Sequence, residues 1–439
     1  MKKKLFVIFL SLVMVVTMMP LSVFASTSEE AEIVKGSDIP KGAILRLPID
    51  NSTGIVAYTD AIEDVDGTSC LDYQVLDTNS NTDDSDYMFV TSKYILSNVI
   101  MLNDERRAKW SKDGELPNYY RGWRDAETGK WKWELDENGN KILANTYQGS
   151  DLQKWCEDYE KALPSVIQNN TLETYKQDQI HKEIEEISYF GKSELVGDKV
   201  FIPSAAEAAN EEYFEKYSGR MANGSSPWWW TRSPDIDISQ CEGVVNDDGS
   251  FIFNDEHVDF NGMRASMNLS KGLLFENKGN NVYTLANAVQ FDANGGKWKD
   301  NTENTKDYSL ADKTEMPTIA EVIDEINDGQ NPTREGYEFI GWALTKDAED
   351  SEVVSKDAEV SPSEIYYAVW QKEEPTPIPT PDPTPTPDPT PVPAPVNHKA
   401  TAANKTTPNT ADANDMWIYA GMLALAVGGI TILALRKEG

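Results

Sequence analysis

Hydrophobic and polar positions divide this chain of 439 residues into segments of three kinds. Between residues 31 and 372 they alternate or recur at short intervals, as in strands and helices with one buried face. Residues 5–19 and 416–435 are largely apolar throughout, and residues 375–395 carry a proline at every second position. The pattern therefore predicts a folded, multidomain α+β region between two targeting or anchoring segments.

Residues 31–286 are expected to form a mixed α+β domain, because strand-like and helix-like periods both occur there. The hairpin turn is Asn138–Gly139, and capping boxes open two of the helices. The expected elements are strands over 71–76, 87–91 and 199–202, a hairpin over 130–143, and helices over 172–187 and after Ser150 and Ser204.

The N-terminus has the features of a secretory signal peptide. Three lysines at positions 2–4 precede the apolar run, Pro20 ends it, and Ala25 is the small residue that a cleavage site needs. We expect residues 1–25 to be removed after Ala25 during export. The alternative is an uncleaved anchor, for which the apolar run is short.

The C-terminus combines an apolar run with a basic end. Residues 416–435 carry no charge and are long enough, at ~1.5 Å per residue, to span a hydrocarbon core of ~30 Å as a helix. Arg436 and Lys437 follow directly and favour a cytoplasmic tail. This segment therefore predicts a transmembrane helix.

A five-residue motif precedes this run, and it consists of Thr407, Pro408, Asn409, Thr410 and Ala411. With the apolar run and the basic tail it resembles the sortase sorting signal of Gram-positive bacteria, Leu-Pro-x-Thr-Gly, although Thr and Ala replace Leu and Gly. The resemblance implies that a sortase reads residues 407–439, cuts after Thr410 and joins Thr410 to peptidoglycan, so the membrane span is transient. A permanent single-span anchor is the alternative.

Residues 373–406 are expected to form a stalk. Each proline fixes φ and removes a backbone donor, so the alternating segment can form neither helix nor sheet and adopts an extended polyproline II rod. At ~3.1 Å per residue, the 22 residues from 375 to 396 reach about 70 Å. The usual role of such a segment is a spacer through the cell wall.

Residues 287–372 carry a second set of motifs. These are Phe-Asp-Ala-Asn-Gly-Gly at 291–296, Pro-Thr-Arg-Glu-Gly-Tyr at 332–337, Gly-Trp at 341–342 and Val-Trp at 369–370. The set resembles the Listeria–Bacteroides surface repeat, which is similar to the B repeat of internalins. The resemblance implies one β-grasp-like repeat that serves as a spacer, with Phe339, Trp342 and Trp370 in its core and an inserted helix near residues 317–326.

The most distinctive motifs of the large domain lie near its end. They are Trp-Trp-x-Arg-Ser-Pro at 229–234, Val-x-x-Asp-Gly at 245–249 and Asn-Gly-Met-Arg-Ala-Ser-Met at 261–267. These motifs resemble an uncharacterised family of extracellular bacterial domains, in which the third motif reads Asn-Gly-Val-Arg-Pro-Ala-Leu. Their layout is similar to that of C-type-lectin-like folds, a resemblance of fold that transfers no function.

The candidate ligand-binding residues are Trp228, Trp229, Trp230, Arg232 and Arg264. Aromatic faces stack on sugar rings, and guanidinium groups donate hydrogen bonds to hydroxyls, so this set could bind a glycan or a peptide. Neighbouring residues of a strand point to opposite faces, however, so at least one tryptophan faces the core. Core and binding site therefore remain open as interpretations of the cluster.

Composition excludes several classes of function. The formal net charge of -33 disfavours nucleic acid as a partner, since phosphate binding needs basic patches. The three cysteines Cys70, Cys156 and Cys241 are too few and too scattered for a disulfide framework or a zinc site. No cofactor is expected, and the alternative is calcium, for which Asp235 and Asp237, or Asp247 and Asp248, could supply oxygens without a diagnostic spacing. The acidic loop 77–86 begins like a calcium-binding EF-hand loop, but it lacks the glycine and the glutamate that this motif requires.

We interpret the chain as a cell-wall-anchored bacterial surface protein, an adhesin that binds a glycan or protein of a host or neighbouring cell. No sequence motif of a nucleophile, metalloprotease or P-loop is present, so no catalytic residue is assigned and an enzyme is not expected. The alternative is a surface enzyme that uses paired carboxylates on glycans or wall polymer.

Overall fold

The computed structural model describes the chain from residue 32 to residue 373 with short gaps. The described ranges are 32–102, 107–110, 118–216, 218–221, 228–239, 241–303 and 305–373. Within these ranges no helix is both long and apolar enough to cross a membrane. The predicted signal peptide, stalk, sorting signal and transmembrane helix lie outside the described residues.

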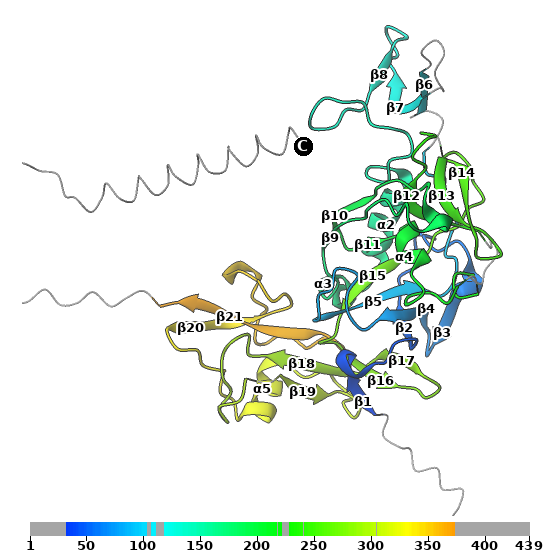
Figure 1. Cartoon of the computed structure of the whole chain (residues 1–439). Coiled ribbons are helices and arrows are strands. Elements are labelled where there is room, and N and C mark those ends of the chain that lie inside the picture. The colour runs from blue at the N-terminus through cyan, green and yellow to red at the C-terminus, as the bar shows by residue number, and fades with distance from the viewer. Residues whose placement is uncertain are drawn as a thin grey trace, which may run out of the picture. The chain divides into compact units, whose positions relative to one another are not determined.

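A nine-stranded sheet forms the centre of the N-terminal domain (Figure 1). Its strands are β1 (Ile33–Lys35), β2 (Ile44–Pro48), β3 (Ile62–Val65), β4 (Thr68–Asp77), β5 (Tyr87–Ser92), β11 (Val200–Phe201), β15 (Ser266–Ser270), β16 (Leu274–Asn277) and β17 (Val282–Leu285). Their order is β1-β16-β17-β2-β4-β5-β15-β11, and β3 also pairs with β4. The pairing of β17 with β2 is parallel. Strands from both ends of the domain therefore lie side by side.

The strands predicted at 71–76, 87–91 and 199–202 are confirmed as β4, β5 and β11. The middle of β4 is buried on both faces, as expected for an inner strand of a covered sheet. Leu71, Tyr73 and Val75 belong to the same hydrophobic core as Phe89 and Phe201. This core fixes the register of the strands that carry the site residues below.

Two of the predicted helices are confirmed. The helices of the domain are α2 (Asp151–Ala162), α3 (Ser165–Asn169) and α4 (Ala205–Ala209), with the 3-10 turns η2 (Gly36–Asp38), η3 (Thr59–Ala61) and η5 (Glu185–Ile187). Ser150 caps α2 by accepting a hydrogen bond from the amide of Gln153 at 3.2 Å. Ser204 and Glu207 form a reciprocal capping box on α4, so the residues that begin each helix are those that the sequence indicates.

The helix predicted over 172–187 is wrong. Residues 174–177 form β9 (Thr174–Gln177), which pairs antiparallel with β10 (Glu194–Asp198). In a strand the side chains of Lys176 and Asp178 lie on one face, and both reach the buried Arg232 network described below. In a helix the side chains of Lys176 and Asp178 would point in different directions. The pairing of β9 with β10 therefore overrides the helical spacing of the apolar residues.

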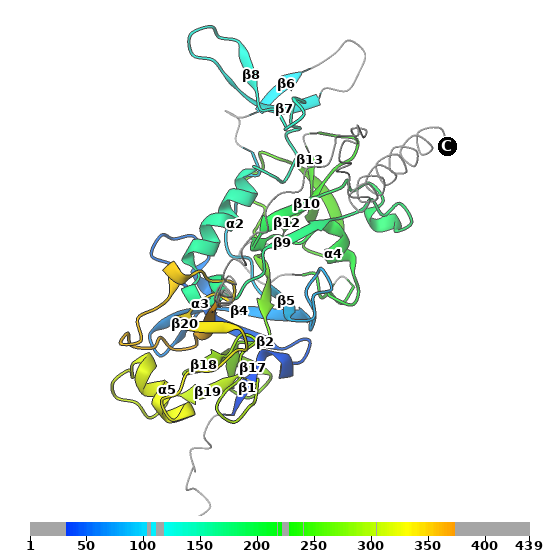
Figure 2. The ribbon, with the colours of Figure 1, turned by 90° about the vertical axis from the view of Figure 1, so that its left-hand side faces the viewer.

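Two smaller sheets complete the domain. One contains β12 (Trp229–Pro234), β13 (Cys241–Val245) and β14 (Phe251–Asp255), and the other contains β6 (Arg107–Trp110), β7 (Asn118–Arg124) and β8 (Trp131–Trp133). The second sheet stands out from the body of the domain in both ribbon views, and we call residues 118–143 the arm (Figures 1 and 2). The hairpin predicted over 130–143 is confirmed within it, since Leu135 bridges Lys141.

The region 287–372 forms a four-stranded sheet with one helix. Its elements are β18 (Ala288–Asp292), β19 (Lys306–Ser309), α5 (Ile319–Asn327), β20 (Tyr337–Ala343), the 3-10 turn η6 (Asp350–Glu352) and β21 (Ile365–Lys372). The order is β19-β18-β21-β20. Trp342 is buried in the core of this sheet, and Phe339 and Trp370 pack against it half-buried. The whole described structure is thus a mixed but strand-rich fold with several sheets.

Candidate functional site

Four of the five predicted ligand-binding residues lie inside the protein. Trp229, Trp230 and Arg232 are 0% exposed and Arg264 is 2% exposed. The indole nitrogens of the two tryptophans donate to backbone carbonyls, Trp229 to Arg220 at 3.0 Å and Trp230 to Val99 at 2.7 Å. Large rings that also satisfy their polar atom are typical of core residues. A ligand at the surface therefore cannot reach these four side chains.

Trp228 differs from its two neighbours because it is only half-buried. Its ring meets the ring of Phe260 edge-on, with 5.5 Å between the centroids, and Phe260 is 49% exposed. Of the predicted set, Trp228 is thus the residue that retains accessible aromatic surface. The structure does not bring Arg232 to it, since that guanidinium lies in a separate buried network.

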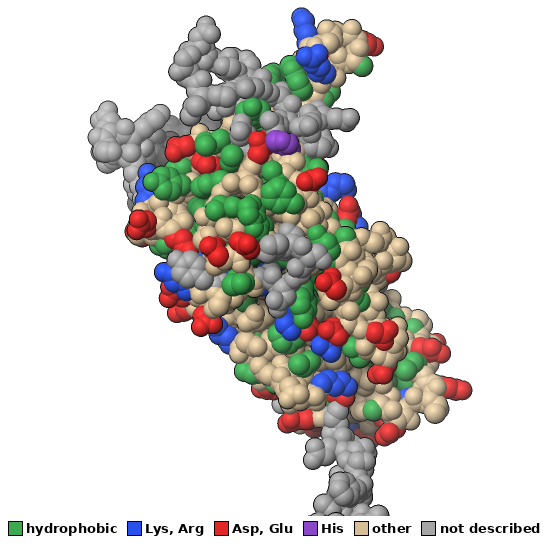
Figure 3. Space-filling model, turned by 90° about the vertical axis from the view of Figure 1, so that its right-hand side faces the viewer, with side chains coloured by type: hydrophobic (Ala, Val, Ile, Leu, Met, Phe, Trp, Pro, Cys, Tyr) green, Lys and Arg blue, Asp and Glu red, His purple; other side chains and the backbone are tan. Residues whose placement is uncertain are grey.

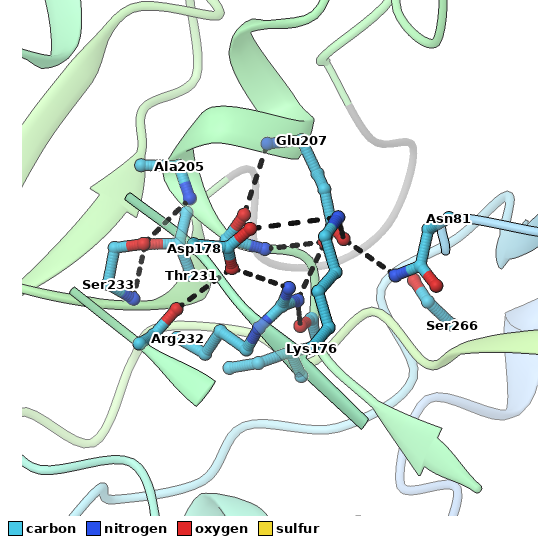
Figure 4. A network of polar contacts seen from close by, with 12 residues as sticks. Asn81, Lys176, Asp178, Ala205, Glu207, Thr231, Arg232, Ser233 and Ser266 are labelled. Carbon is cyan, nitrogen blue, oxygen red and sulfur yellow. Dashed lines mark hydrogen bonds and ion pairs between the residues drawn. The ribbon is translucent and has the colours of Figure 1, made fainter. Parts of the chain in front are cut away.

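Arg232 is the centre of this network (Figure 4). Its Nη1 donates to Glu207 Oε2 at 2.6 Å and to the Ile202 carbonyl at 2.7 Å, and its Nη2 donates to Asp178 Oδ2 at 2.7 Å. Lys176 Nζ lies 2.6 Å from the other oxygen of Glu207. Two cations and two carboxylates therefore compensate one another away from water, as buried charges must.

The electrostatics of the network keep Glu207 ionised. Burial alone would raise the pKa of Glu207, but the positive charges of Arg232 and Lys176 outweigh it and hold that pKa far below its usual range. The same pairing raises the pKa of Arg232 against the opposing effect of burial. Glu207 therefore carries its negative charge at neutral pH.

A hollow of about 570 Å³ opens beside this network. Its walls include Lys176, Asp178 and Glu207 from the network, together with His181 and Tyr213. Lys176 is 22% exposed, so its ammonium group connects the buried charges with the hollow. One sequence signal indicates this place, the capping box at Glu207, but no signal indicates that β9 supplies a lysine there.

Arg264 has a different environment. Its Nε and Nη2 donate to the Ser92 carbonyl at 3.0 and 2.9 Å, and its guanidinium lies over the rings of Phe214 and Trp229 at 5.3 and 5.1 Å. Burial lowers its pKa to about 10. This cation is therefore stabilised by carbonyl and π-electron contacts, and it acts as a core residue.

The arm carries a cluster of partly accessible aromatic side chains. Trp131 and Trp133 of β8 stack with centroids 6.3 Å apart at an angle of 24°, and Tyr120 of β7 meets Trp133 edge-on at 5.8 Å. All three rings are half-buried. They occupy one face of the arm, because residues two apart in a strand share a face and Gly122 faces Trp133 across the pair. We call these three residues the aromatic strip.

Two cations border the aromatic strip. The Arg124 guanidinium lies 5.7 Å from the Trp131 ring, and the Lys141 ammonium lies 4.0 Å from the Trp133 ring. Figure 3 shows basic side chains at the end of the arm, next to hydrophobic and acidic ones. Within an acidic chain this face combines flat apolar surface with hydrogen-bond donors. The sequence signal for it was the alternation of tryptophan and lysine at 130–133, whereas Arg124 was missed.

Buried carboxylates gather where the arm joins the body. Glu242 and Glu256 are 0% exposed, and among the described residues neither oxygen of Glu242 has a hydrogen-bond partner. Burial raises the pKa of Glu242 well above its usual value; Arg121 opposes this rise and Glu256 adds to it. Ligand-capable atoms of Asp255, Glu256 and His257 lie within 4.8 Å of one another, but such an acidic group alone does not define a metal site.

In the acidic loop 77–86, side-chain oxygens of Asp77 and Asp84 accept hydrogen bonds from the loop's own backbone. Asp77 accepts from the amide of Asn79, and Asp84 accepts from the amide of Asp86. The Asn81 side chain is buried against Glu207. These contacts account for the spacing of acids and amides in this loop as turn chemistry within the described residues.

Comparison with known proteins identifies one part of the chain. Residues 87–271 match a family described as "Domain of unknown function (DUF6273)". The match spans less than half of the chain and covers the arm, the Arg232 network and all five predicted ligand-binding residues. Neither the curated proteins nor the solved structures include a match to this chain.

Proposed function

We propose that this protein is a surface adhesin of a Gram-positive cell and that the aromatic strip of the arm binds a glycan. The sequence features at 1–25 and 407–439 support export followed by covalent attachment to the cell wall through Thr410. The stalk and the β-grasp-like repeat would hold the N-terminal, C-type-lectin-like domain away from the wall. The single observation that carries the binding function is the stacked pair Trp131 and Trp133 beside Arg124.

The chemistry of the aromatic strip favours a sugar. The C–H face of a sugar ring is flat and packs on an aromatic ring, while its hydroxyls need hydrogen-bond donors at the edge of that ring. Trp131 and Trp133 supply the flat surface, and Arg124 supplies the donors. The guanidinium would also favour a sugar that carries a carboxylate or sulfate.

The alternative function, a surface enzyme, depends on paired carboxylates. Burial raises the pKa of Glu242, as such a pair would need, but the Glu242 and Glu256 side chains are both fully buried and do not meet a polymer at the surface. A binding function is therefore the better supported of the two. Turnover assays on wall polymers and glycans remain the direct test of the enzyme.

Binding of the mature protein, residues 26–410, to an array of neutral and acidic glycans tests the proposal. Replacing both Trp131 and Trp133 by Ala should weaken a glycan hit about tenfold or more, since about 1.4 kcal/mol of lost contact corresponds to a factor of ten. Trp123→Ala is the matched control, because Trp123 is 47% exposed on the opposite face of the arm. Silence on all glycans, or equal loss with the control, would contradict the aromatic strip as the site.

A further inference from the structure

Two side chains that can react with each other meet at one carboxylate oxygen. Lys176 Nζ and Asn81 Nδ2 each lie 2.6 Å from Glu207 Oε1, and Figure 4 shows all three side chains converging there. Lys176 belongs to β9, Asn81 to the loop between β4 and β5, and Glu207 to α4. An amine, a carboxamide and a base are thus in one place, although they come from three distant parts of the chain.

Asn268 of β15 fixes the carboxamide of Asn81 in position. Its Nδ2 donates to Asn81 Oδ1 at 2.7 Å, and its Oδ1 accepts from the Asn81 backbone amide at 3.0 Å. Asn268 is 0% exposed and Asn81 is 6% exposed. The carbonyl oxygen of Asn81 therefore faces a fixed hydrogen-bond donor, which is the arrangement that stabilises negative charge on a carbonyl oxygen under attack.

We propose that Lys176 and Asn81 form an intramolecular amide cross-link, with Glu207 as the base that transfers the proton. The required residues are a nucleophilic amine, an electrophilic carbonyl, a proton carrier in contact with both nitrogens, and a donor for the oxyanion. All four are present in the described structure as Lys176, Asn81, Glu207 and Asn268.

The reaction balances without an oxidant or another reactant. Glu207 takes a proton from the Lys176 ammonium, and the neutral amine attacks Cγ of Asn81. Asn268 Nδ2 stabilises the oxyanion of the tetrahedral intermediate. Glu207 then returns the proton to the departing nitrogen of Asn81. One C–N bond forms, one C–N bond breaks, and ammonia leaves and takes up the second proton from the lysine as ammonium.

The surroundings suit each step. Arg232 donates to the other oxygen of Glu207, which holds the carboxylate in place and leaves Oε1 in contact with both nitrogens. The hollow beside Lys176 and Glu207 gives the ammonia a path to solvent. Burial of Asn81 excludes water, which would otherwise compete with the amine for the carbonyl.

The product would constrain the fold covalently. None of the three cysteines forms a disulfide. A bond between residues 81 and 176 would close a loop that includes β5, the arm and α2, and it would limit the unfolded chain as a disulfide does.

Peptide mapping of the full-length protein by mass spectrometry tests the proposal. The expected result is a single linked peptide pair that contains Asn81 and Lys176, lighter than the two peptides by one ammonia. Recovery of both peptides unlinked, after prolonged incubation of the folded protein, would overturn it. This readout needs no variant and does not depend on how the chain ends are processed.

Variants then show whether the loss of ammonia comes from a bond between Lys176 and Asn81. In Lys176→Arg the guanidinium keeps its charge beside Glu207 but forms no such amide, so the loss should disappear. Lys199→Arg is the matched control, since Lys199 lies in the same domain near Glu160, and the loss should persist there. An ammonia loss that persists in Lys176→Arg would instead belong to ring closure at an Asn-Gly sequence such as Asn138–Gly139, and it would count against the cross-link.

Discussion

The guanidinium of Arg264 lies 5.1 Å from the centre of the Trp229 ring, and both side chains are buried. These residues belong to two separate sequence motifs of the matched family region, at 229–234 and 261–267. Their contact joins β12 to the segment before β15. In this chain the motifs therefore maintain the packing of the domain.

Trp229→Ala should destabilise the domain by about 3–5 kcal/mol, because it removes a fully buried ring and leaves a cavity. Chemical denaturation followed by tryptophan fluorescence measures this loss. Trp123→Ala should change the free energy of unfolding by no more than about 0.5 kcal/mol, since Trp123 is 47% exposed. Equal stability of wild type and Trp229→Ala would return this tryptophan to the list of ligand-binding candidates.

Arg232→Met should cost about 3–5 kcal/mol of stability, because Glu207 and Asp178 would lose the cation that compensates their burial. The double variant Arg232→Met/Glu207→Gln should recover part of this loss, since it also removes one of the two buried carboxylates that the single variant leaves without their cation. A double-mutant cycle by urea denaturation gives the coupling. Strictly additive losses would mean that the two side chains do not interact.

Glu242→Gln should stabilise the protein progressively more as the pH rises above 4.5. The pKa of Glu242 is raised in the folded state, so the folded protein holds a proton that the unfolded chain releases. Wild-type stability from this group is therefore complete below pH 4.5 and is lost as the pH rises through the folded pKa. Melting temperatures of both proteins between pH 4 and 9 test this, and a constant difference would contradict it.

Thr410→Ala should prevent covalent attachment if a sortase reads residues 407–411. The variant should move from the wall fraction, where boiling detergent does not release it, to the membrane or the medium. Fractionation of the producing cells with an antibody to the N-terminal domain measures the shift. Asn409→Ala is the control, because the resemblance leaves that position open to any residue. A variant that stays in the detergent-resistant wall fraction would exclude this bond as the attachment point.

Local signals predicted much of the fold. Strands β4 and β5 followed from alternation, and the starts of α2 and α4 followed from their capping residues, because these features depend on neighbours in sequence. The prediction for the segment 172–187 is wrong because β9 pairs with β10 and Asp178 pairs with Arg232, and both partners are distant in sequence. Periodicity contains no information on such a partner.

The candidate site was harder to predict. A Trp-Trp-Trp-Thr-Arg run indicates either core or surface, and the choice depends on whether other layers cover both faces of β12. Both faces of β12 are covered, so Trp229 and Trp230 are both buried although their side chains point in opposite directions. The aromatic strip had a clear alternation, but only the pairing of β7 with β8 brings Arg124 beside Trp131.

The parallel pairing of β2 with β17 also bears on how the protein is made. Ile44 pairs with Val282, so the middle of the central sheet cannot close before almost the entire domain is available. Contacts this distant in sequence form slowly, because the intervening chain must be ordered first. A chain that emerges gradually through a secretion channel would therefore stay unfolded until its last strands arrive. If the chain is exported as proposed, delayed folding of this kind would keep the polypeptide able to pass through the channel.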